Sequence, residues 1–167
     1  MRLLHVFAVP VLFLATLLLF SVGLKAEDME AKITNDEVTK LVAQTCVDLQ
    51  KDAPATLAAI NKGQAPYKDA ANPTLYVFVY DLEVKLVAHP KPELVGKSMK
   101  GKPDLKGHKF RDEIVEKAQK ESKGWTYYMY QKPGETGMFE KATYCEFIKG
   151  SDGAPYVVCS GKYSDKK

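Results

Sequence analysis

The stretch TLYVFVYDL, residues 74–82, carries aromatic or aliphatic side chains at nearly every position. Such residues are typical of β-strands. Successive side chains of a strand point to opposite faces, which places Tyr76, Phe78 and Tyr80 on one face and Val77 and Val79 on the other. Neither face is polar. We therefore expect this strand to lie inside a sheet that is covered on both faces.

The residues before this strand predict helix. The segment 34–50 opens with a capping box, Thr34 followed by Glu37 three positions later, and its apolar residues recur at helical spacing. Asp52 and Pro54 restart a helix, since proline is tolerated in a first turn, and Gly63 ends it. We expect one long helix with a break, or two helices in line.

The residues after the strand predict a second short strand, a helix and three more strands. The second strand covers residues 84–89, and Pro90 and Pro92 force the chain out of it. The helix covers residues 108–122, ends before Gly124 and turns an apolar face inward, formed by Phe110, Ile114, Val115 and Ala118. The last strands are expected at 125–131, 140–148 and 155–163. This order predicts an α+β domain with a five-stranded sheet.

Two of the three cysteines flank a turn-rich stretch. A hairpin centred on Asp152 would place Cys145 and Cys159 directly opposite each other, close to the distance that a disulfide requires. We predict this disulfide; two small apolar residues on a strand face are the alternative. Cys46 falls on the apolar face of the first helix, so a buried free thiol is expected there.

The first 26 residues predict a secretory signal peptide. Arg2 gives a positive start, residues 3–24 carry no charge, and small residues precede Glu27. Cleavage after Ala26 leaves residues 27–167 as a single domain in the periplasm or outside the cell. Cleavage after Gly23 and an uncleaved membrane anchor are the alternatives.

Charge and motifs exclude several functions. Without Arg2 and Lys25 the net charge of +3 falls to +1, and no basic stripe with interleaved aromatic residues is left, so nucleic acid is not an expected partner. The chain has no Cys-x-x-Cys, no Gly-rich phosphate loop and no Gly-x-Ser-x-Gly elbow. We expect no cofactor, no metal and no enzyme activity. A thiol-dependent enzyme that uses Cys46 is the alternative.

Five stretches in the same order resemble the single Cache domain: LYVFVYDLEVKLVAHPKPELVGKSM, the helix from Phe110, GWTYYMYQKPG, EKATYC and YVVCSGKY. This family forms the extracytoplasmic ligand-sensing modules of bacterial chemoreceptors and sensor kinases. The resemblance implies a PAS-like five-stranded antiparallel sheet with the long N-terminal helix packed on one face. The other face would enclose a small-ligand pocket. The family usually has an Asp-Gly turn where this chain has Glu83 and Val84.

The resemblance also implies a set of ligand-binding residues. His89, Trp125, Tyr128 and Lys141 match recurring family positions, Phe78 and Tyr80 resemble wall residues, and Tyr130 shares a strand face with Tyr128. Family ligands are small organic acids, amino acids or related metabolites. The ammonium of Lys141 would attract a carboxylate.

Each of these assignments has a plainer alternative. His89 could instead fix the course of the loop it enters, Lys141 could be solvated beside Glu140, and Trp125 could be a core residue. The chain ends at SDKK soon after the last strand, so we expect a stand-alone sensor module in signal transduction. Its partner would be a membrane receptor or a sensor kinase, and a membrane-tethered sensor with an uncleaved leader is the alternative.

Overall fold

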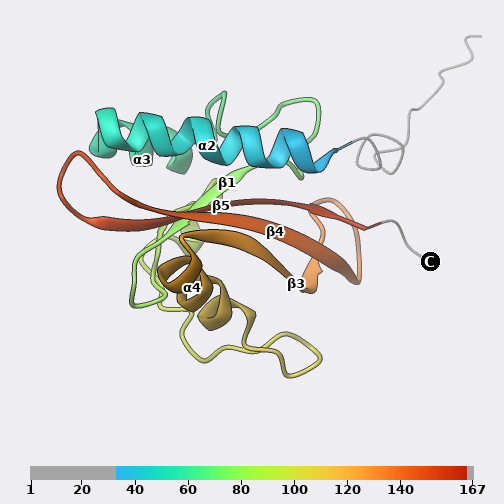
Figure 1. Cartoon of the computed structure of the whole chain (residues 1–167). Coiled ribbons are helices and arrows are strands. Elements are labelled where there is room, and N and C mark those ends of the chain that lie inside the picture. The colour runs from blue at the N-terminus through green and yellow to red at the C-terminus, as the bar shows by residue number, and fades with distance from the viewer. Residues whose placement is uncertain (1–32, 165–167) are drawn as a thin grey trace, which may run out of the picture.

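The computed structural model describes residues 33–164, so the predicted signal peptide lies outside the described residues. Two helices lie along one face of a five-stranded sheet and a third lies under the other face (Figure 1). All strand pairs are antiparallel, in the order β2-β1-β5-β4-β3. No helix in this part of the chain is long and apolar enough to cross a membrane.

The first two helices are α2 (Asn35–Lys51) and α3 (Ala53–Asn61). At the start of α2 the hydroxyl of Thr34 accepts the backbone N–H of Glu37, and the Glu37 carboxylate accepts the backbone N–H of Thr34. This is the predicted capping box. The break falls at Asp52, whose carboxylate accepts the backbone N–H of Ala55 and so begins α3. The two helices therefore lie in line.

The strands are β1 (Val77–Tyr80), β2 (Leu86–Ala88), β3 (Lys123–Gln131), β4 (Met138–Lys149) and β5 (Pro155–Tyr163). All four residues of β1 are buried, and β1 lies between β2 and β5. The expectation of a strand covered on both faces is confirmed. A short 3-10 helix, η1 (Pro92–Leu94), follows β2, and α4 (Phe110–Glu121) precedes β3.

Each face of the sheet carries its own apolar core. Val38, Val42 and Leu49 of α2 pack with Val77 and Val158 on the upper face in Figure 1. The four inward residues predicted for α4 are all buried on the opposite face, where they pack with the aromatic side of β1. Burial of this kind contributes about 25 cal/mol per Å² of apolar surface. The second core is aromatic, and it surrounds the cavity described below.

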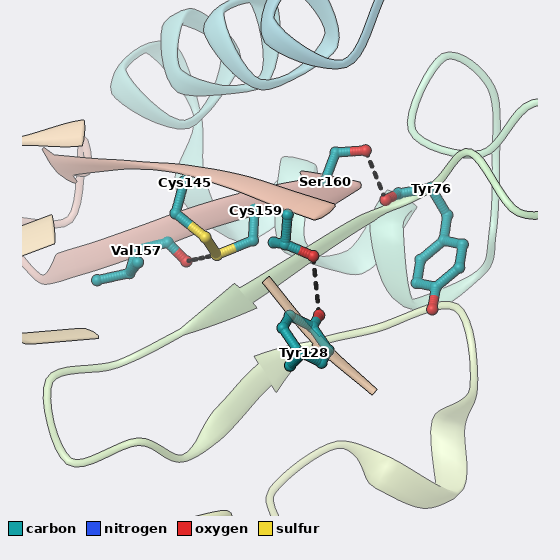
Figure 2. Close-up of a disulfide and its surroundings, with 7 residues drawn as sticks. Tyr76, Tyr128, Cys145, Val157, Cys159 and Ser160 are labelled. Carbon is teal, nitrogen blue, oxygen red and sulfur yellow. Dashed lines mark hydrogen bonds between the residues drawn. A yellow bond between two sulfur atoms is a disulfide. The ribbon is translucent and has the colours of Figure 1, made fainter. Parts of the chain in front are cut away.

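The predicted hairpin brings two cysteines together. Cys145 and Cys159 are directly opposed in the register of β4 and β5, their Cα atoms lie 4.2 Å apart, and their sulfurs form a disulfide (Figure 2). Both are buried in the core on the α4 face. Cys46 is the free cysteine of the described residues and is buried under α2, as predicted.

Two turns differ from the expected pattern. The left-handed residue after α4 is Ser122, with φ 67°, whereas Gly124 belongs to β3. In the β1–β2 turn, Val84 has φ 59° and is buried. This is the site where the resembling family usually has glycine. A β-branched residue with positive φ is unusual.

Candidate functional site

A small cavity lies between the sheet and α4, on the face opposite α2. We call it the aromatic pocket. It is lined by Tyr76, Phe78, Tyr80, Leu86, His89, Leu94, Met99, Phe110, Arg111, Tyr128, Tyr130 and Lys141. Its volume is about 20 Å³, which holds roughly one water molecule. A larger ligand therefore requires some lining side chains to move.

Lys141 is the most deeply buried charged group of the pocket, with 1% of its surface exposed. Its Nζ donates a hydrogen bond of 3.0 Å to the hydroxyl of Tyr76 and lies 4.5 Å from the centroid of that ring. The rings of Tyr163, Phe78 and Tyr130 lie 4.8, 5.5 and 5.5 Å from it. Burial of a charge costs several kcal/mol, and each aromatic face offsets only about 0.5–2 kcal/mol of that.

Alternation along β4 explains why Lys141 points inward. Lys141 pairs with Tyr128 of β3 and with Tyr163 of β5, and all three side chains stand on the α4 face. The glycine at position 161 leaves room for the lysine stem, because a Cβ there would lie 3.1 Å from Cε of Lys141. The alternative of a solvated lysine beside Glu140 is wrong for this structure.

The hydroxyls of the two tyrosines that pair with Lys141 across the sheet are held by neighbours. The hydroxyl of Tyr128 lies 2.8 Å from Oγ1 of Thr143 in the bond drawn in Figure 2, and that of Tyr163 donates to the carbonyl of Gln131 at 2.9 Å. Burial raises the pKa of both phenols. Both therefore stay protonated at neutral pH, as neutral hydrogen-bonding groups.

His89 closes the pocket beside β2. Its ring centroid lies 5.3 Å from that of Tyr76 in an edge-on arrangement, and Nδ1 accepts the backbone N–H of Lys91 at 2.8 Å. Burial, followed by the charges of Lys141, Lys91 and Lys68, lowers the pKa of His89 to about 3. The imidazole is neutral at pH 7, with its proton on Nε2.

Arg111 adds a second cation to the lining. It stands in the first turn of α4, and its guanidinium carbon lies 4.1 Å from the ring centroid of Phe110 and 5.7 Å from that of Tyr130. Within the described chain, no aspartate or glutamate lines the pocket. With a neutral His89, the cavity presents two positive groups and no carboxylate.

The structure brings most of the predicted site residues into this pocket. Those that line it are Phe78, Tyr80, His89, Tyr128, Tyr130 and Lys141. Trp125 does not reach it. Trp125 packs against Tyr144 with ring centroids 5.3 Å apart, in the core under α2. Because strand side chains alternate, residue 125 lies on the opposite face of β3 from residue 128.

Sequence reasoning missed several lining residues. Tyr76 follows from the same alternation that identified Phe78, and Phe110 was expected only as a core residue. Leu94 and Met99 lie on the loop after β2, where no periodicity exists to follow. Arg111 had one available signal: arginine occurs in this chain only at positions 2 and 111, among 24 basic residues.

Cys46 lacks the properties of a nucleophile. It is buried among the apolar residues of α2, and burial, followed by the charge of Glu146, raises the pKa of its thiol to about 12. Reactive cysteines have a lowered pKa and an exposed sulfur. These observations weigh against the thiol-dependent enzyme.

An antiparallel five-stranded sheet with a long helix on one face is a PAS-like fold. The chain belongs to the Cache domain family, whose model matches residues 68–166. Cache domains are extracytoplasmic sensor domains of signalling proteins. No curated protein matches the chain.

Three solved structures that are similar to this chain come from chemosensory proteins. A periplasmic sensor domain of a chemotaxis protein is 26% identical with a TM-score of 0.59, and the match covers 84% of this chain and 94% of that one. A Cache chemosensory domain solved for its recognition of a carboxylic acid is 20% identical with a TM-score of 0.62, over 78% and 92% of the two chains. A methyl-accepting chemotaxis protein from Vibrio parahaemolyticus is 18% identical with a TM-score of 0.60, over 77% and 86%.

Proposed function

We propose that this chain is an extracytoplasmic sensor module that binds a small organic acid in the aromatic pocket. The observation that carries the proposal is a buried ammonium, that of Lys141, in the wall of a cavity lined mainly by aromatic side chains. A ligand carboxylate would accept charge-assisted hydrogen bonds from this ammonium. The aromatic walls exclude water, which strengthens such contacts.

The lining favours an organic acid over an amino acid. The α-ammonium of an amino acid needs a carboxylate or several well-placed acceptors. The pocket instead holds the cations of Lys141 and Arg111, a neutral His89, and tyrosine hydroxyls. An added ammonium would meet like charge in a water-poor site. Simple carboxylates are therefore the proposed ligand class.

We propose in addition that the bound state acts on a membrane receptor or a sensor kinase. The family and the chemotaxis relatives support a role in signal transduction. For export, we propose that residues 1–26 are a signal peptide and that residues 27–167 form the mature domain. N-terminal sequencing of periplasmic protein should then begin at Glu27 or Leu24. Full-length chain found solely in the membrane fraction would establish the tethered form instead.

The ligand class can be tested by thermal unfolding against small carboxylates, amino acids and amines. A ligand at a hundred times its dissociation constant adds about 2.7 kcal/mol of stability, which raises the Tm of a domain of this size by several degrees. We expect carboxylates to raise the Tm and amines to leave it unchanged. A panel in which amines bind and carboxylates do not would contradict the proposal.

The role of the ammonium can be tested by Lys141→Met. Methionine keeps the length and apolar character of the stem, so the domain should fold, and carboxylate binding should be lost. Lys149→Met is the matched control, because Lys149 is an exposed lysine of the same strand; binding should be unchanged there. Equal carboxylate affinity in Lys141→Met and the wild type would show that the ammonium does not hold the ligand.

A further inference from the structure

The mouth of the aromatic pocket is formed by three residues. Leu94, Arg111 and Tyr130 are half-buried, whereas the other nine lining residues are buried. The cavity itself has room for about one water molecule. An organic acid therefore enters at this mouth, where Arg111 has the longest and most flexible side chain.

The guanidinium of Arg111 is held by aromatic rings and neutral acceptors. It stacks over the ring of Phe110, donates a hydrogen bond of 3.2 Å to the carbonyl of Lys102 and interacts with the hydroxyl of Tyr80. Within residues 33–164, no carboxylate lies within ion-pair distance of it. Since a guanidinium has five N–H donors, donors stay available for a ligand.

Arg111 and Lys141 both lie near the ring of Tyr130. The guanidinium carbon is 5.7 Å and the ammonium nitrogen 5.5 Å from the ring centroid of Tyr130. The two cations are therefore at most about 11 Å apart. An extended four-carbon dicarboxylate with a contact of about 2.8 Å at each end reaches across a gap up to this limit.

We propose that Arg111 is a second anion-binding residue, which makes the pocket select short dicarboxylates over monocarboxylates. The inference rests on the proposed function and narrows its ligand class. One carboxylate of the ligand pairs with Lys141 inside the cavity, and the other receives the planar donor fork of Arg111 at the mouth. Arginine suits this place because its fork matches a carboxylate in two parallel hydrogen bonds and its plane stacks on aromatic rings.

The test compares two probes of equal chain length, succinate and butyrate, by isothermal titration calorimetry. In the wild type we expect succinate to bind at least about tenfold more tightly, the usual effect of one charge-assisted contact. In Arg111→Gln the affinities for succinate and butyrate should become equal. The ratio is taken within one protein, so a smaller folded fraction cancels.

Lys109→Gln is the matched control. Lys109 is exposed and lies two residues before Arg111, so this variant also removes one positive charge. It should keep the preference for succinate. Equal affinities in the wild type, or a preference that survives in Arg111→Gln, would overturn the role of Arg111 and leave the organic-acid pocket standing. A wild type that binds neither probe nor any other carboxylate would contradict the proposed function itself, and this inference with it.

Discussion

Nδ1 of His89 accepts the backbone N–H of Lys91 at 2.8 Å, and this bond gives one imidazole two roles. It fixes the course of the chain as it leaves β2 toward Pro92, and it turns the ring edge toward Tyr76 in the pocket. The backbone N–H of His89 is held in turn by Oδ1 of Asn61 in α3. His89 therefore connects the helix layer, the loop and the pocket.

Stability should depend on pH through His89. Its pKa is about 3 in the folded chain and about 6.5 when unfolded, so between these values the unfolded chain binds a proton that the native chain does not. Stability is therefore complete above pH 7 and falls as the pH drops through 6.5. From pH 7 to pH 5 the loss should be about 2 kcal/mol, measured by guanidinium unfolding at each pH.

His89→Asn is the control for this slope. The asparagine Oδ1 can still accept the N–H of Lys91, and no group is left to titrate. The variant should lose less stability than the wild type between pH 7 and pH 5. Equal slopes in the two proteins would show that His89 is protonated as readily in the fold as outside it.

The disulfide should be present in the folded protein and should stabilise it. Replacing both Cys145 and Cys159 by alanine opens a loop with a sequence separation of 14, which should cost about 3 kcal/mol by the chain-entropy model. Mass spectrometry of a non-reduced digest should show the two peptides linked. A bridge from Cys46 to either of them would contradict the structure.

The thiol of Cys46 should be inert in the native protein. It is buried, and its pKa is raised to about 12, so a thiol reagent at pH 8 meets neither an exposed sulfur nor a thiolate. We expect no labelling under native conditions and one labelled thiol per chain in guanidinium. Fast labelling of the native protein would instead support the alternative of a thiol-dependent enzyme that uses Cys46.

Much of the fold could be predicted because it depends on local patterns. The capping box at Thr34, the break at Asp52 and the directly opposed cysteines each follow from spacing within a few residues. The burial of β1 follows from its two apolar faces. The helix does end before Gly124, but the left-handed residue that follows it is the exposed Ser122 and not the glycine.

The site was harder to predict than the fold. Alternation alone puts Trp125 and Tyr128 on opposite faces, so a site containing both could not lie on one side of the sheet. Arg111 was overlooked because a charged residue next to an inward Phe110 is normally solvated. The guanidinium lies near the rings of both Phe110 and Tyr130 because α4 packs against β3. A local sequence pattern does not contain this tertiary contact.

Val84 and Ser122 both have positive φ, but substitution by glycine should change the stability in opposite directions at the two sites. Relief of the left-handed conformation is worth about 1–2 kcal/mol at either site. Val84 is buried, and losing its side chain costs about 1.5–3 kcal/mol; glycine also costs entropy. We expect Val84→Gly to destabilise by about 1 kcal/mol and the exposed Ser122→Gly to stabilise slightly. Denaturant unfolding midpoints measure both changes. A stabilised Val84→Gly would mean that the backbone strain at Val84 is larger than the free energy gained by burying its side chain.

Gly161 should tolerate no side chain, because it lies on β5 directly beside Lys141 of β4. A Cβ at this position would lie 2.5 Å from the carbonyl oxygen of Ala142 and 2.6 Å from Oγ1 of Thr143. The first of these atoms is backbone, so Gly161→Ala must push the strands apart beside Lys141. We expect a loss of about 1–3 kcal/mol together with weaker carboxylate binding.

Gly124→Ala is the comparison, since Gly124 is also a strand glycine without positive φ. Its added Cβ would lie 3.0 Å from Cδ of Lys117, a flexible side chain that can shift by a few tenths of an ångström. We expect a change within about 1 kcal/mol and unchanged ligand affinity. Denaturant unfolding and calorimetry of both variants make the comparison. If Gly161→Ala kept full stability and full affinity, the close packing of β5 against Lys141 would not be what positions the ammonium in the pocket.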